Sequence, residues 1–111
     1  MIMSNGSFDD REKGFEAKYK RDQETEFKVM ARRNKLLGLW AAEQMGLGGS
    51  DAEAYAKEVV VADFEEAGDA DVLRKVLADL TQNGVGADER IVRKEMDKLV
   101  NIAREEITSE G

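Results

Sequence analysis

Apolar residues recur every three or four positions from Phe27 onward, the spacing of one face of an α-helix. Five glycines interrupt this pattern and predict turns between four helices: Gly46, Gly48, Gly49, Gly68 and Gly84. The four apolar stripes expected to form the core are, in chain order, Phe27, Met30, Ala31, Leu36, Leu37, Leu39, Trp40 and Ala41; Tyr55, Val59, Val60, Ala62 and Phe64; Leu73, Val76, Leu77 and Leu80; and Val92, Met96, Leu99, Ala103 and Ile107. Short turns predict roughly antiparallel neighbours, so the expected fold is an all-α four-helix bundle.

Capping residues precede three of these stripes. Ser50, with Glu53 three positions later, has the form of a capping box at the start of the second helix. Asp69 or Asp71 is expected to cap the third helix, and Asp88 the fourth.

Residues 1–26 differ from the rest because they contain no Leu and no Val. They do hold three of the seven aromatic residues, Phe8, Phe15 and Tyr19, among closely spaced charges. Such a segment cannot build a core, and Gly14 costs about 1 kcal/mol of helix propensity. We therefore expect a flexible N-terminal segment, residues 1–19, that is disordered or weakly helical when alone. The four-helix bundle domain then takes residues 20–111.

Composition excludes several classes of function. The chain has no His and no Cys, so the commonest metal ligand, the usual proton-transfer group and any thiolate nucleophile are missing. We therefore expect no enzyme and no metal site. A net charge of −7 disfavours nucleic acid as a partner. No apolar run is long enough for membrane insertion, and the first residues do not resemble a signal peptide, so a cytoplasmic location is expected.

Two groups of residues are candidate binding sites. In a helix, Phe8, Phe15 and Tyr19 fall near one face, as in elements that fold on binding a partner. The alternative is that these aromatics fold back onto the bundle. The second group is the basic cluster Arg32, Arg33 and Lys35, which admits three interpretations: a solvated helix face, a partner contact, or a nucleotide contact.

Longer stretches of the chain resemble a known family. The strings are FDDREKGFEAKY from Phe8 to Tyr19 and ARRNKLLGLWAAE from Ala31 to Glu43, with shorter ones at 55–56, 60–64, 68–72 and 103–107. Together they resemble the zeta subunit family, the ATPase inhibitor subunit of certain bacterial F-type ATP synthases. The likeness covers roughly residues 7–110.

The resemblance implies a four-helix bundle whose N-terminal segment becomes helical between catalytic and rotor subunits and blocks rotation in the hydrolytic direction. Carried over to this chain, the inhibitory residues are Phe8, Asp9, Asp10, Arg11, Glu12, Lys13, Phe15, Glu16, Lys18 and Tyr19. The expected partners are those catalytic and rotor subunits of the ATP synthase. Bound to them, the protein would lie at the periphery of the inner membrane. When free, it is expected to be a monomer. Two features depart from the family: a long lead-in at residues 1–6, and Gly14 where alanine is expected.

Two other functions remain open on the residues alone. One is a small bundle that senses adenine nucleotides weakly through Arg32, Arg33 and Lys35, with no other cofactor. The other is a protein-interaction adaptor unconnected with the motor.

Overall fold

The computed structural model describes residues 2–64 and 68–110, and its side chains from residue 22 onward in these ranges. Four α-helices follow one another: α1 (Ile2–Gln44), α2 (Gly49–Ala62), α3 (Ala70–Gln82) and α4 (Glu89–Glu110). Within the described residues there is no strand, which confirms the all-α class and the number of helices. None of the described helices is both long enough and apolar enough to cross a bilayer.

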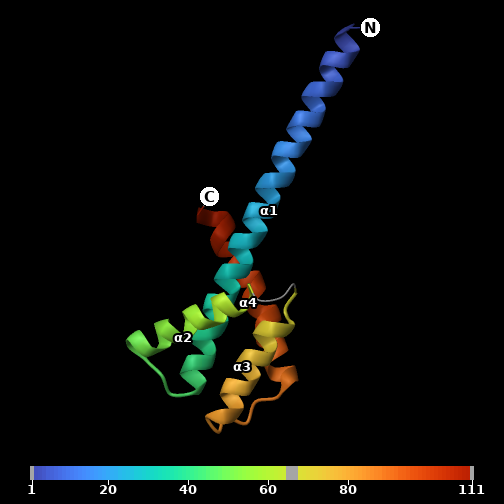
Figure 1. Ribbon diagram of the computed structural model, residues 1–111. Helices are drawn as coiled ribbons and strands as arrows, with labels where there is room; N and C mark the ends of the chain where they lie inside the picture. The colour runs from blue at the N-terminus through green and yellow to red at the C-terminus, as the bar shows by residue number, and fades with distance from the viewer. Residues whose placement is uncertain (1, 65–67, 111) are drawn as a thin grey trace.

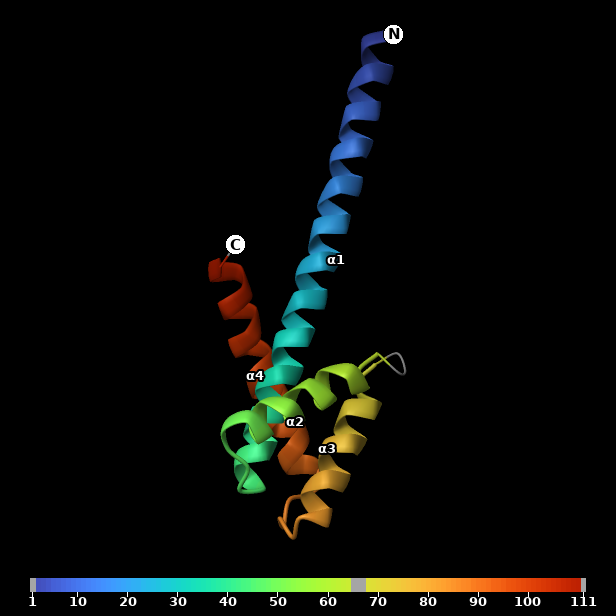
Figure 2. The same ribbon diagram turned by 60° about the vertical axis from the view of Figure 1, so that its left-hand side comes forward.

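The molecule is elongated, 70 × 25 × 21 Å, because the N-terminal half of α1 projects from the other helices (Figure 1). The C-terminal half of α1 packs mainly against α2 and α4. α1 and α3 run in the direction opposite to α4, as expected of a bundle (Figure 2). α2 instead runs across α1 at a steep angle in both views, so the expectation of roughly antiparallel neighbours is wrong for this helix.

The core lies where the four helices meet. Its fully buried centre contains Leu37 of α1, Val59 of α2, Leu80 of α3 and Met96 of α4. The α4 stripe is confirmed, since Val92, Met96, Leu99 and Ala103 are all buried and Ile107 is half-buried. Trp40 is half-buried and packs against the edge of this core rather than filling its centre.

The buried face of α1 is rotated from the expected one. It runs through Val29, Arg33, Asn34, Leu37, Gly38, Ala41 and Ala42. Phe27, expected in the core, is 59% exposed, and Phe64, expected on the face of α2, is 62% exposed and lies beyond the end of that helix. Two polar residues on the buried face, Arg33 and Asn34, hide its periodicity from the sequence.

Two helices end as the glycines predict. After α1, the Leu47 amide donates to the Ala42 carbonyl at 2.8 Å, with Gly46 between them at φ +77°. After α3, the Val85 amide donates to the Leu80 carbonyl at 2.9 Å, with Gly84 at φ +76°. Both are Schellman-type ends, which need a residue that accepts positive φ at the position glycine occupies.

The helix starts match the predictions only in part. The Ile91 amide donates to Asp88 Oδ1 at 2.9 Å, which confirms the cap of α4. The capping box at Ser50 is wrong, because α2 begins at Gly49 with Gly48 as its N-cap. Asp69 holds the N-cap position of α3 but forms no capping hydrogen bond through its side chain.

A polar contact ties α2 to α3 at the edge of the core. The Tyr55 hydroxyl donates to Asp79 Oδ2 at 2.8 Å, and Lys75 Nζ lies 3.0 Å from the same oxygen. Burial of Tyr55 and its hydrogen bond to the Asp79 carboxylate raise the pKa of the phenol well above its usual value. The neutral phenol is thus part of the folded structure.

Candidate inhibitory helix and its base

Residues 8–19, expected to form the inhibitory element, lie in the projecting half of α1 (Figure 1). Here α1 is one helix of 43 residues, so the expected boundary between residues 19 and 20 falls inside an unbroken helix. The side chains of residues 8–19 lie outside the described ones. Their roles therefore stay predictions, as does the division into domains at this point. What the structure does define is the base from which this half of α1 rises.

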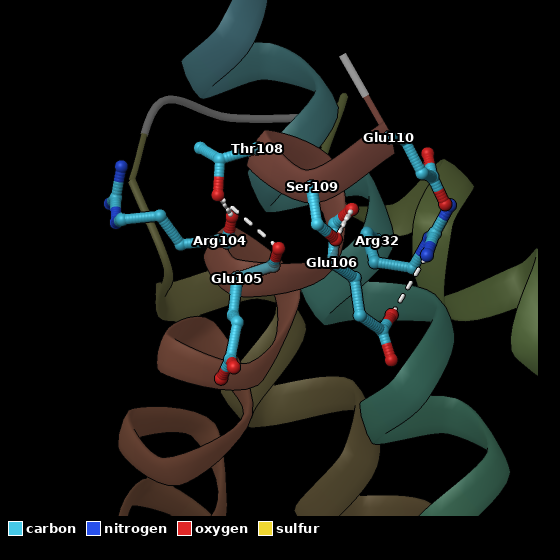
Figure 3. Close-up of polar contacts among 7 residues, drawn as sticks. All are labelled: Arg32, Arg104, Glu105, Glu106, Thr108, Ser109 and Glu110. Atoms are coloured by element: carbon cyan, nitrogen blue, oxygen red, sulfur yellow. Dashed lines mark hydrogen bonds and ion pairs between the residues drawn. The ribbon is translucent and has the colours of Figure 1, made fainter.

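The last turns of α4 hold one side of that base through ion pairs that are exposed or partly buried. Arg32 Nη1 of α1 lies 2.8 Å from Glu106 Oε1, and Arg32 Nη2 lies 3.0 Å from Glu110 Oε1 (Figure 3). Nearly two helical turns closer to the N-terminus of α1, Glu26 pairs with Arg104. The hydrogen bond from Arg104 lowers the pKa of the Glu26 carboxyl group. These pairs fix α1 against α4 at the level where α1 leaves the bundle.

On another side of α1, the buried side chain of Arg33 connects this helix to the start of α3. The Arg33 side chain is only 3% exposed, and its Nη2 lies 2.9 Å from Asp69 Oδ1, at the start of α3. Its Nε donates to Asn34 Oδ1 at 2.9 Å. The interpretation of the basic cluster as a solvated face is therefore wrong for Arg33, whose charge is satisfied by a carboxylate 36 residues away.

The three basic candidates consequently have three different surroundings. Arg32 is engaged by α4, Arg33 is buried against Asp69, and Lys35 is exposed. Lys35 lines a surface hollow of about 340 Å³ together with Glu53, Ala56, Lys57, Val60 and Val61. The three cations do not converge on this hollow. Their contact with a partner or an adenine nucleotide stays a prediction.

Sequence reasoning missed an aromatic pair at the same base. The rings of Phe27 and Phe64 stack with their centroids 5.9 Å apart and their planes at 26°. The sequence places both residues in the expected core because each falls near an apolar stripe. The loss of helical periodicity after Ala62 was the signal that Phe64 leaves the helix face.

A metal site would need several acidic residues close together, because Asp and Glu are the acidic ligands this chain has. In the part of the chain whose side chains are described, no three acidic residues lie close enough together to hold a metal ion, and the sequence has neither His nor Cys. The described residues at the base of the projecting half of α1 are instead held together by salt bridges and side-chain packing.

Comparison with known proteins identifies the family. A family model described as ATPase inhibitor subunit zeta matches residues 3–106, which includes the projecting half of α1 as well as the bundle. A protein solved in solution by NMR is 50% identical, with a TM-score of 0.68, over 77% of this chain and 96% of that one. A search of curated proteins found no match. Because the family match spans almost the entire chain, the protein belongs to the ATPase inhibitor subunit zeta family.

Proposed function

We propose that this protein inhibits ATP hydrolysis by an F-type ATP synthase, with the N-terminal half of α1 as a wedge and the bundle as its anchor. Residues 8–19 insert as a helix at an interface between catalytic and rotor subunits and block rotation in the hydrolytic direction. The family is one of ATPase inhibitor subunits, which supports the inhibitory role. The protein then works as a regulator rather than as an enzyme, in the cytoplasm at the periphery of the inner membrane.

The observation that carries this proposal is that α1 extends far beyond the helices it packs against (Figure 2). A helix of about 12 residues is ~18 Å long at 1.5 Å per residue, which suffices to enter a cleft between subunits. Because α1 continues without a break into the core, the wedge is fixed to its anchor through the backbone itself.

Blocking a rotary motor requires no bond to be made or broken. It requires a body that fits one rotational state and enough binding free energy to stay there. Ordering the segment costs conformational entropy. Burial of each aromatic ring at the interface contributes ~2 kcal/mol toward that cost, which gives Phe8, Phe15 and Tyr19 their proposed role.

The test separates inhibition from anchoring. The protein without residues 1–19 is titrated into the purified matching ATPase, and hydrolysis and synthesis are followed separately. Among the side chains that the structure describes, the buried ones begin at Val29, so the shortened chain retains all of these and should fold. We expect its inhibition of hydrolysis to vanish.

The double substitution Phe8→Ala/Phe15→Ala is the finer variant, and its loss of inhibition should be smaller because the charged residues remain. Undiminished inhibition by the shortened chain would contradict the proposal and would move the activity to the bundle surface. Circular dichroism of each variant checks that the helices are retained.

A further inference from the structure

The surface around Phe27 and Phe64 has the character of a binding site rather than of an ordinary solvated face. Although the two rings stack on each other, they remain 59% and 62% exposed. Large exposed aromatic side chains are costly to leave in water and are enriched at protein interfaces. Phe27 comes from α1 and Phe64 from the turn after α2, so the pair is held by the fold rather than by one helix alone.

A hollow of about 500 Å³ adjoins this pair. It is lined by Phe27 and Met30 from α1, and its rim carries the acidic residues Asp22, Glu26 and Asp63, together with Gln23. Glu26 is already paired with Arg104. Within residues 22–64 and 68–110, neither Asp22 nor Asp63 has an ion-pair partner. We call the set Asp22, Phe27, Met30, Asp63 and Phe64 the base patch.

One residue of the base patch, Met30, lies on the helical face proposed to enter the ATPase. In a helix each residue turns by about 100°, so positions 8, 15, 19, 26 and 30 of α1 fall within about 60° of one another. The helix is unbroken from Ile2 to Gln44, so this relation holds along its length. A partner that covers positions 8–19 and follows α1 toward the bundle therefore meets Met30 next. Phe27 lies about 60° further round the helix, outside this face, but it lines the same hollow as Met30.

We propose that the base patch is a second docking surface, which receives a segment of the ATPase that carries apolar side chains flanked by Lys or Arg. This inference rests on the proposed function and adds the anchoring contact to it. Apolar groups of the partner fill the hollow beside Phe27 and Phe64, while its cations face Asp22 and Asp63. The acidic rim favours a partner segment of positive charge, and the aromatic pair supplies most of the apolar surface that is buried on binding.

Two other occupants fit the patch less well. The chain's own N-terminal segment is part of α1 and runs away from the patch, so it would have to break that helix to return (Figure 1). A second copy of this chain would present the same acidic rim to Asp22 and Asp63, and like charges at an interface are unfavourable.

The test uses the full chain and the purified catalytic sector of the matching ATPase. The variant Phe27→Ala/Phe64→Ala is compared with Ile91→Ala, in which an apolar residue of similar exposure (45%) is removed from the first turn of α4. We expect the aromatic variant to raise the half-inhibitory concentration about tenfold or more, while inhibition at saturation is unchanged because the wedge is intact. Ile91→Ala should behave as the unaltered protein.

A charge-reversal arm tests the rim separately. Asp22→Lys/Asp63→Lys should also raise the half-inhibitory concentration, and the salt dependence of binding should become weaker because attraction to a basic partner is lost. Denaturation midpoints show whether each variant is folded, and both substituted pairs are solvent-accessible enough for the bundle to tolerate them.

The outcomes distinguish this inference from the function on which it rests. If the unaltered protein inhibits and Phe27→Ala/Phe64→Ala does so at the same concentration, the docking surface is refuted and the wedge stands. If the unaltered protein does not inhibit, the proposed function itself fails. If the free protein sediments as a dimer that the aromatic substitutions dissociate, the patch binds a second copy, and the inference is overturned.

Discussion

Gly38 of α1 lies directly against the backbone of Ala56 in α2. A Cβ added at Gly38 would come within 2.6 Å of Ala56 Cα and 3.2 Å of Val59 Cγ2. The glycine is thus what allows α2 to cross α1 at a steep angle and at close range. The contact joins the long helix to the bundle at the level of the core residue Leu37.

Gly38→Ala should therefore destabilise the fold. In an isolated helix this substitution would be favourable by ~1 kcal/mol. Here the methyl group meets backbone rather than a movable side-chain end, and overpacking of this kind typically costs about 1–3 kcal/mol. The free energy of unfolding, from urea titration, is the measurement. Gly86→Ala is the control, since nothing lies within 4 Å of that position. A higher midpoint for Gly38→Ala would show that α2 can shift at no cost.

Arg33→Ala should destabilise the bundle far more than Lys35→Ala, although the two residues belong to the same basic cluster. Removal of Arg33 leaves Asp69 without its partner and empties a site that is 3% exposed. Loss of one member of a buried pair costs ~3–5 kcal/mol, and the 38% exposure of Asp69 reduces this to about 2–3 kcal/mol. Lys35 is exposed, so its loss should stay within about 0.5 kcal/mol. Equal midpoints for the two variants would contradict the ion pair.

Tyr55 should make the protein sensitive to alkali. The fold raises the pKa of its phenol, whereas the unfolded chain releases the same proton near pH ~10. Above that pH the unfolded state binds fewer protons than the folded state, so the free energy of unfolding falls as pH rises. The slope attributable to one group reaches about 1.4 kcal/mol per pH unit.

Tyr55→Phe provides the comparison for this pH dependence. The variant should be less stable by ~1 kcal/mol at neutral pH, because Asp79 loses a donor. Its stability should then decline less steeply above pH ~10 than that of the unaltered protein. Parallel curves for the two proteins would mean that Tyr55 ionises as readily in the folded state as in the unfolded one.

Gly14→Ala should strengthen inhibition if residues 8–19 act as a helix. The substitution removes ~1 kcal/mol of helix penalty within α1 and adds only a methyl group. The half-inhibitory concentration for ATP hydrolysis should fall by up to about fivefold, as that free energy allows. Gly86→Ala, outside α1, should leave inhibition unchanged. Weaker inhibition by Gly14→Ala would indicate that the partner approaches the backbone closely at this position.

Backbone motion should differ along α1 in the free protein. Helices without tertiary packing are marginal in water, and the apolar stripe needed for such packing is missing from residues 1–19. Heteronuclear NOE values for Phe8 to Tyr19 should therefore be lower than those for Leu36 to Ala42, which lie in or beside the core. Uniform values along the whole helix would show that the segment is rigid before it binds.

The parts of the fold that follow from local patterns were predictable. The α4 stripe, the Asp88 cap and the glycine-ended helices α1 and α3 all depend on residues close together in the sequence. The start of α2 differs from the capping box expected at Ser50 because Gly48, a residue type that also suits N-cap positions, precedes the helix. The steep crossing of α2 depends on one contact, Gly38 with Ala56, which no periodicity reveals.

The surroundings of the candidate site were harder to predict for the same reason. Arg32 and Arg33 look alike in sequence, yet their carboxylate partners lie 74 and 36 residues away, in α4 and at the N-cap of α3. Phe27 follows the helical period of α1 but points away from the core, and the buried polar residues Arg33 and Asn34 conceal from the sequence which face of α1 is buried. Charge and hydropathy along the chain show which residues could interact, and the folded backbone decides which of them do.

Because α1 is unbroken, the number of residues between the wedge and the core sets the direction in which the wedge faces more than the distance it extends. Insertion or deletion of a single residue between Tyr19 and Val29 would turn positions 8–19 by about 100° about the helix axis while moving them only 1.5 Å along it. An insertion of seven residues would lengthen the arm by ~10 Å and restore its direction to within about 20°. Related chains should therefore differ at this point in steps of whole helical turns, since a single-residue change would aim an otherwise intact wedge away from its cleft.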